Sequence, residues 1–169
     1  SALARRLESR DDPYAELLMS PQRKYLAGQA GLARYGRVGR RIAAALDDRG
    51  IPYVVTEQNR EQVEALRKRG IAAVAGNAAD PSALIQAHIA DAAMLVIATP
   101  DPVGVRRMAE IARKLNPSIE IVLRTHSEDE SQLLTKEGIG KVFFGEEELA
   151  RGMTSHVLER FAPAGAGGH

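Results

Sequence analysis

The chain has 169 residues, of which 44% are hydrophobic and 27% charged, and its net charge at pH 7 is +1. This length fits one domain with its own hydrophobic core. The nearly balanced charge argues against a general nucleic-acid binder, which needs a strongly basic face. The absence of cysteine excludes disulfides and thiolate metal sites. No apolar run approaches the roughly 18 residues of a membrane-spanning helix, and the first six residues do not form a signal peptide.

Residues 1–29 are predicted to be a linker or N-terminal extension, because mixed charges and prolines dominate them. Within this stretch a short helix is expected around Tyr14 to Met19. Residues 30–161 are predicted to form the single folded domain. The tail, residues 162–169, is too rich in glycine to order itself.

The domain alternates predicted strands and helices. The expected strands are Ala30–Arg34, Ile51–Glu57, Ile71–Ala75, Met94–Thr99, Ile119–Thr125 and Lys141–Phe144. Most are continuous apolar runs, which is typical of a parallel sheet buried on both faces. The fold class is therefore α/β, a Rossmann-like doubly wound parallel sheet of six strands in a single domain. Its ligands bind in a crevice at the carboxyl ends of the strands.

Helix starts are marked by capping residues. Asn59 with Gln62 and Ser127 with Glu130 have capping-box spacing. Two further N-caps precede a first-turn proline, at Asp80-Pro81 and Asp101-Pro102.

Helix ends are marked by Gly50, Gly70, Gly138 and Asn116-Pro117. The last helix is expected from Glu146 to Phe161. It carries one apolar stripe, formed by Leu149, Met153 and Val157.

The run from Arg34 to Gly39, Arg-Tyr-Gly-Arg-Val-Gly, contains the last two glycines of the dinucleotide-binding pattern G-x-G-x-x-G. These glycines allow a tight turn, close approach of the backbone to a phosphate, and close packing of helix on sheet. Glu57 stands at the end of the second strand, about 20 positions beyond, where an acidic residue holds the ribose hydroxyls.

Arg34 replaces the first glycine of this pattern. If the turn needs a positive φ there, arginine is strained by something like 1 kcal/mol or more. We expect a distorted loop and a weak site, because the preceding Gly31-Leu32-Ala33 offers little bulk to hold the strand in register. Alternatively the guanidinium pairs with a phosphate as an extra anchor.

Polar and turn residues follow the other strands, at Gln58-Asn59, Gly76-Asn77-Ala78, Thr99-Pro100 and Arg124. The fold brings such residues to one crevice, although any one of them can be ordinary turn chemistry. Charges in the first helix add a clue, since Arg37, Arg40 and Arg41 precede Asp47-Asp48. This order opposes the helix dipole, and a bound anion would relieve it. The alternative is that these arginines are simply solvated.

Metal binding and catalysis find little support in the sequence. The four histidines show no paired spacing, and His88 is expected at a helix surface or edge. No nucleophile motif is present. The triplet Glu146-Glu147-Glu148 lies where a helix start favours carboxylates, which explains it better than a cation site does.

These motifs together resemble the cytoplasmic nucleotide-binding domain, called RCK, KTN or TrkA-N, of Kef-type monovalent cation:proton antiporters. The residues that carry the resemblance are Tyr35 to Arg40, Glu57 to Arg60, Gly76 to Ala78, Ile97 to Pro100, and Gly145 to Ala150. The resemblance covers about Ala30 to Arg160. It implies a homodimeric regulatory domain on the cytoplasmic face of the bacterial inner membrane. A membrane antiporter portion precedes it in the same protein.

The resemblance further implies NAD(H) or AMP as the bound regulatory ligand. Phosphate would lie on Gly36, Arg37, Val38 and Gly39, next to Tyr35, and Glu57 with Gln58 and Asn59 would hold the ribose. Asn77 and Ala78 would border the adenine, Thr99 and Pro100 would line the crevice floor, and Arg124 would contact phosphate or an interface. Two alternatives stay open: the coenzyme-binding half of an NAD-dependent dehydrogenase, and a Rossmann interaction module that has lost its ligand.

Overall fold

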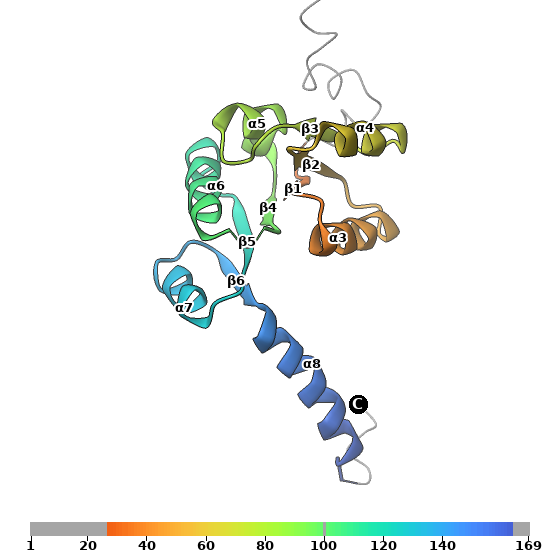
Figure 1. Cartoon of the computed structure of the whole chain (residues 1–169), viewed down its shortest axis with the longest axis vertical. Helices are drawn as coiled ribbons and strands as arrows, with labels where there is room; N and C mark the ends of the chain where they lie inside the picture. The colour runs from red at the N-terminus through yellow and green to blue at the C-terminus, as the bar shows by residue number, and fades with distance from the viewer. Residues whose placement is uncertain (1–26, 100, 164–169) are drawn as a thin grey trace, which may run out of the picture.

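The computed structural model describes residues 27–99 and 101–163 of the chain (Figure 1). Six parallel strands form one sheet in the order β3-β2-β1-β4-β5-β6, which confirms the doubly wound Rossmann-like fold. The strands are β1 (Ala30–Ala33), β2 (Tyr53–Glu57), β3 (Ala73–Ala75), β4 (Met94–Ile97), β5 (Glu120–Thr125) and β6 (Lys141–Phe144). The helices are α3 (Arg37–Asp48), α4 (Arg60–Lys68), α5 (Pro81–Gln86), the 3₁₀ helix η2 (Ile89–Asp91), α6 (Pro102–Leu115), α7 (Glu128–Lys136) and α8 (Gly145–Arg160).

The strand β1 lies at the centre of the sheet and is held on both sides. Ala33 is in register with Thr56 of β2 and with Ile97 of β4. All four residues of β1 are buried. The expectation that Gly31-Leu32-Ala33 is too small to hold register is therefore wrong. A Cβ at position 31 would lie 2.6 Å from Cδ1 of Ile89, so a larger residue there would require the Ile89 side chain to move.

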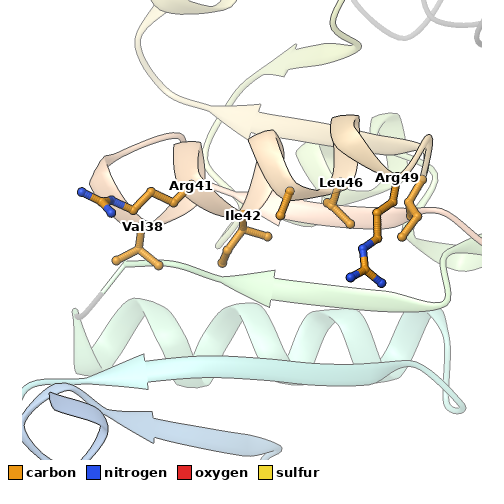
Figure 2. Close-up of a pocket in the computed structure, with 7 residues that line it drawn as sticks. Val38, Arg41, Ile42, Leu46 and Arg49 are labelled. Carbon is orange, nitrogen blue, oxygen red and sulfur yellow. The ribbon is translucent and has the colours of Figure 1, made fainter. Parts of the chain in front are cut away.

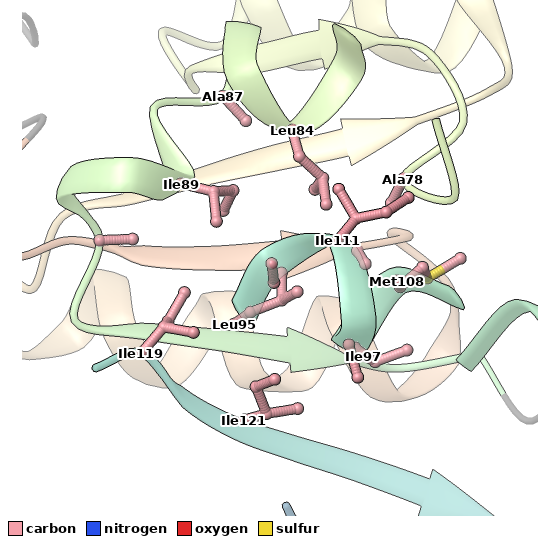
Figure 3. Packing of buried hydrophobic residues seen from close by; sticks show 14 of the residues in the cluster. Ala78, Leu84, Ala87, Ile89, Leu95, Ile97, Met108, Ile111, Ile119 and Ile121 are labelled. Carbon is pink, nitrogen blue, oxygen red and sulfur yellow. The ribbon is translucent and has the colours of Figure 1, made fainter. Parts of the chain in front are cut away.

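The two faces of the sheet carry different layers. On one face α3 packs on β1, and α4 packs on β2 and β3. Their core includes Leu32, Val55, Val63 and Val96. On the other face α5, η2, α6 and α7 enclose a larger cluster, in which Leu84 and Ile111 meet Leu95 and Ile121 of the strands (Figure 3).

Capping residues act largely as the sequence predicts. Each predicted N-cap side chain accepts a hydrogen bond from a backbone N–H of the helix that follows. These N-caps are Asn59, Asp80, Asp101 and Ser127. The return bonds of the two capping boxes are absent among the described residues. Glu130 lies 3.6 Å from Arg106, and Gln62 donates elsewhere. Gly50, Gly70 and Gly138 have positive φ after the helices that they end.

At the amino end of the sheet, two buried amides hold η2 in place. Nε2 of Gln29 donates to the carbonyl of His88 (3.1 Å), while Nδ2 of Asn116 donates to the carbonyls of Ile89 (3.0 Å) and Ala92 (2.9 Å). His88 itself follows α5 with φ 58°, so it is not the helix-surface residue that the sequence suggests.

Helix α8 leaves the body of the fold after β6 (Figure 1). It buries no residue, and its predicted stripe of Leu149, Met153 and Val157 is exposed by 51–64%. In the part of the chain that the structure describes, no helix is long and apolar enough to cross a bilayer. The expected short helix around residues 14–19 lies outside the described residues, as do most of the linker and residues 164–169 of the tail.

Candidate functional site

The glycine loop between β1 and α3 has the backbone geometry of a complete fingerprint. Arg34 is exposed and has φ 82°, the left-handed conformation that the missing glycine would adopt freely. Its N–H still donates to the carbonyl of Thr56 (2.8 Å). A Cβ on Gly39 would lie 2.5 Å from the Arg34 carbonyl oxygen, so α3 packs against β1 as closely as the pattern requires. The expected distortion of this loop is therefore wrong.

Gly36 lies at the outer side of the same loop. A Cβ built on it would have no neighbour within 4 Å, so its backbone is open to a ligand. Gly36 is also the N-cap of α3, yet no side chain caps this helix and its first turn contains no acidic residue. The free first-turn N–H groups, together with the exposed Arg37 and Arg40, form a positive end suited to an anion.

Glu57 joins the glycine loop to the end of β2. Its carboxylate is buried, with a relative exposure of 6%, and accepts the N–H of Tyr35 at Oε2 (2.9 Å). Oε1 accepts the N–H groups of Gln58 (3.1 Å) and Asn59 (3.3 Å). Three of the roughly four acceptor directions of the carboxylate are therefore used inside the protein. One direction remains for a hydroxyl donor.

Tyr35 supports the loop from the core side. Its ring is buried with Leu32 and Val55, and the guanidinium of Arg40 lies 5.6 Å from its centroid. Its carbonyl accepts Nε2 of Gln62 over 2.8 Å. Gln62 is a loop-fixing residue that sequence reasoning missed, since its spacing from Asn59 predicted only a capping role.

The remaining predicted residues are held mainly by turns at the same carboxyl edge of the sheet, where the carboxyl ends of the strands meet. Oδ1 of Asn77 accepts the N–H of Ala79 (2.9 Å), and Ala78 is buried in the core. Thr99 is buried and its Oγ1 accepts the N–H of Asp101 (3.5 Å). Half-buried Arg124 donates from Nη1 to the carbonyl of Ala98 (3.5 Å). Pro100 lies outside the described residues.

Val38 faces away from this edge, into a groove along the flank of α3 (Figure 2). The groove has a volume of about 480 Å³. Its lining is apolar apart from two arginines, and consists of Val38, Arg41, Ile42, Ala45, Leu46, Arg49 and Ile51. Because the groove does not include the glycine loop, Glu57 or the later strand ends, we treat it as a surface separate from the crevice.

No group of three or more metal-ligating side chains occurs within residues 27–99 and 101–163. The chemistry of the carboxyl edge is instead that of an anion site beside a hydroxyl acceptor. Backbone N–H groups and arginines supply the positive part, and Glu57 supplies the acceptor. This combination suits a phosphorylated ribose.

Comparison with known proteins shows the family of the chain. The sequence model of the TrkA-N domain family matches residues 32–145. YbaL of Escherichia coli strain K12, named as a cation/proton antiporter, is 39% identical over 140 residues, which are 83% of this chain and 25% of YbaL. The chain thus spans about a quarter of that relative.

Solved structures share the fold. The crystal structure of the TrkA-N domain of the Escherichia coli inner membrane protein YbaL superposes with a TM-score of 0.72 and 39% identity, over 76% of this chain and 96% of that one. The AMP-bound Shewanella denitrificans Kef C-terminal domain gives 0.67 at 22% identity, over 81% and 83%. The NAD-bound GsuK channel gives 0.61 at 21% identity, over 69% and 21%. The chain belongs to the TrkA-N domain family.

Proposed function

We propose that this chain is the regulatory domain of a Kef-type potassium or other cation/proton antiporter. It binds an adenine nucleotide, NAD(H) or AMP, in the crevice at the carboxyl edge. The observation that carries the proposal is the uncapped, arginine-rich start of α3, which lies beside the buried carboxylate of Glu57. The AMP and NAD named for two structures of the same fold are consistent with this choice.

In this proposal the phosphate rests on the N–H groups that follow Gly36, with Arg37 as its counter-charge. Glu57 uses its remaining acceptor direction for a ribose hydroxyl, and Gln58 and Asn59 border the ribose. Asn77 and Ala78 flank the adenine, while Thr99 and Arg124 close the crevice from the β4 and β5 side. Gly39 and Tyr35 act indirectly, because they hold the loop against the core.

The chain acts without catalysis in this proposal, and the bound nucleotide controls ion transport by the membrane antiporter portion of the same protein. That arrangement places the domain on the cytoplasmic face of the inner membrane. The alternative dehydrogenase role needs a proton donor or acceptor beside the nicotinamide. The buried carboxylate of Glu57 does not serve this role in our proposal, because it accepts three backbone N–H groups and uses its remaining acceptor direction for a ribose hydroxyl.

The partner of α8 is proposed to be a second copy of this chain. The helix begins with Glu146, Glu147 and Glu148 and exposes a stripe of large apolar side chains. The groove along α3 offers the complementary surface, since it is apolar and carries Arg41 and Arg49. Two copies that exchange these surfaces form a closed, isologous dimer.

Native mass spectrometry of the purified chain tests the ligand, because a retained nucleotide adds its own mass. Calorimetry with AMP, NAD and NADP then tests the role of Glu57. We expect NADP to bind more weakly than NAD, since a 2′-phosphate meets a carboxylate. Glu57→Gln should weaken AMP and NAD, whereas Glu64→Gln, on the exposed side of α4, should change neither. Equal or tighter binding of NADP contradicts the role of Glu57.

A further inference from the structure

We infer that Arg34 is a phosphate anchor that makes this site favour nucleotides with a terminal phosphate, such as AMP, over the pyrophosphate diester of NAD. The inference rests on the proposed function, because it concerns the same crevice. It assigns a ligand preference to a residue that replaces a glycine of the dinucleotide-binding pattern.

The first support is the strained backbone of Arg34, which the contacts of the turn do not explain. Arg34 is held at φ 82°, a conformation that costs a non-glycine residue stability. The two backbone contacts that fix the turn use only its N–H, which donates to Thr56, and its carbonyl, which Gly39 approaches. Glycine would make both contacts without strain, so the turn alone does not explain an arginine.

The second support is that its side chain is exposed and has no hydrogen bond or ion pair with any residue that the structure describes. Two other arginines of the carboxyl edge are engaged, since Arg40 lies over Tyr35 and Arg124 donates to Ala98, whereas Arg37 is exposed like Arg34. Arg34 therefore projects a charge at the strand end, directly before the uncapped start of α3.

The ligand preference follows from charge and geometry. A guanidinium binds a phosphate best through two parallel N–H···O bonds. The terminal phosphate of AMP carries nearly two negative charges and three free oxygens on one phosphorus atom. Each phosphorus of NAD carries one charge and two free oxygens. Arg34 thus adds more binding energy to the mononucleotide than to the dinucleotide.

Three substitutions separate the charge from the strain. Arg34→Lys keeps the charge and the strain, Arg34→Gln removes the charge and keeps the strain, and Arg34→Gly removes both. If Arg34 is the anchor, affinity for AMP is highest in the wild type and lower in Arg34→Lys, which keeps the charge but loses the two parallel N–H···O bonds. It falls about tenfold in Arg34→Gln and Arg34→Gly. Affinity for NAD falls less than threefold, and rising salt weakens AMP binding more in the wild type than in Arg34→Gly.

The matched control is Arg69→Gln, which removes the same charge at the far end of α4 and should leave both affinities unchanged. Thermal unfolding is measured for each variant, and Arg34→Gly should melt above the wild type because the strain is gone. Binding of AMP by Arg34→Gly that equals or exceeds wild-type binding overturns the inference. A wild type that binds neither AMP nor NAD instead overturns the proposed function, and the inference with it.

Discussion

At the scale of single residues, two non-glycine residues of the described chain have a positive φ, Arg34 (82°) and His88 (58°). The two lie at opposite ends of the sheet. His88 is half-buried, and its carbonyl accepts the side chain of Gln29 and the N–H of Asp91. Burial lowers the pKa of His88 below its usual value, while the charge of Asp91 opposes this shift.

The lowered pKa of His88 makes the fold sensitive to acid. The unfolded chain takes up a proton at His88 near pH 6.5, whereas the folded chain takes it up only at lower pH. This contribution to stability is therefore present above about pH 6.5 and is lost as the pH falls. We expect the melting temperature of His88→Asn to fall less than that of the wild type between pH 7.5 and 5.5. Asn suits this site because it tolerates positive φ.

His126→Asn is the control, since His126 is exposed at the opposite end of the sheet. It should follow the wild-type pH profile. Identical slopes for the wild type and His88→Asn would show that His88 does not titrate differently in the folded chain.

The residue scale is also where sequence reasoning was least complete. The positions of Glu57, Gly36 and Gly39 could be predicted, because the pattern fixes their spacing from the strand ends. The bond of Glu57 to Tyr35 could not, since it depends on two strand ends brought together by the sheet, whereas Gln58 and Asn59 directly follow Glu57 in the chain. Gln62 was missed for the same reason. Its spacing from Asn59 predicts a hydrogen bond within its own helix start, whereas in the fold its side chain donates to the carbonyl of Tyr35.

At the scale of elements, α3 approaches the end of β1 closely at the proposed site. Gly39 permits it, whereas Gly36 has empty space around it. The two glycines of this motif therefore have different roles. One sets the packing of the helix, and the other leaves room for a ligand.

Substitution by alanine should separate those roles. Gly39→Ala places a Cβ against the Arg34 carbonyl, which must shift α3, and should cost about 1 to 3 kcal/mol of unfolding free energy. Gly36→Ala meets no neighbour in the protein and should cost less than about 0.5 kcal/mol. Urea unfolding measures both. AMP binding should weaken in both variants, and an unchanged stability in Gly39→Ala would contradict the packing role.

Element boundaries followed from sequence wherever a cap or a glycine marks them. Helix α6 begins after Asp101 and ends before Asn116, as predicted. The strands are shorter than their apolar runs, by two residues at the start of β2 and of β3. Apolar pattern alone cannot locate these ends, because Ile51 and Ile71 are apolar residues of the connections.

At the scale of the whole molecule, the sheet is covered unevenly. The helices α3 and α4 pack on β1, β2 and β3, and the same face of β5 and β6 presents half-buried Val122 and exposed Phe143. Helix α8 meanwhile exposes Leu149, Met153 and Leu158 by more than 60% each. The stripe of α8 is an exposed apolar surface of the kind that marks a protein–protein contact.

A charge on the stripe of α8 should therefore abolish the proposed dimer. We expect Leu149→Glu/Met153→Glu to sediment as a monomer at micromolar concentration, where the wild type sediments as a dimer. Because neither side chain is buried within one chain, far-UV circular dichroism should remain that of the wild type. The control Ser155→Glu changes an exposed polar residue of the same helix and should leave the dimer intact. A wild type that stays monomeric, with or without nucleotide, excludes this assembly.

The shortness of β1 has a mechanical consequence. This strand has four residues, a length of about 13 Å. Gln29 precedes β1 and donates a hydrogen bond to the carbonyl of His88. Arg34 directly follows β1, where we propose that the phosphate binds. The strand β1 pairs with β2 on one side and β4 on the other, so it is a rigid connection between Gln29 and Arg34. A force applied to the chain at Gln29 and a ligand bound at Arg34 would therefore act on the same strand, β1.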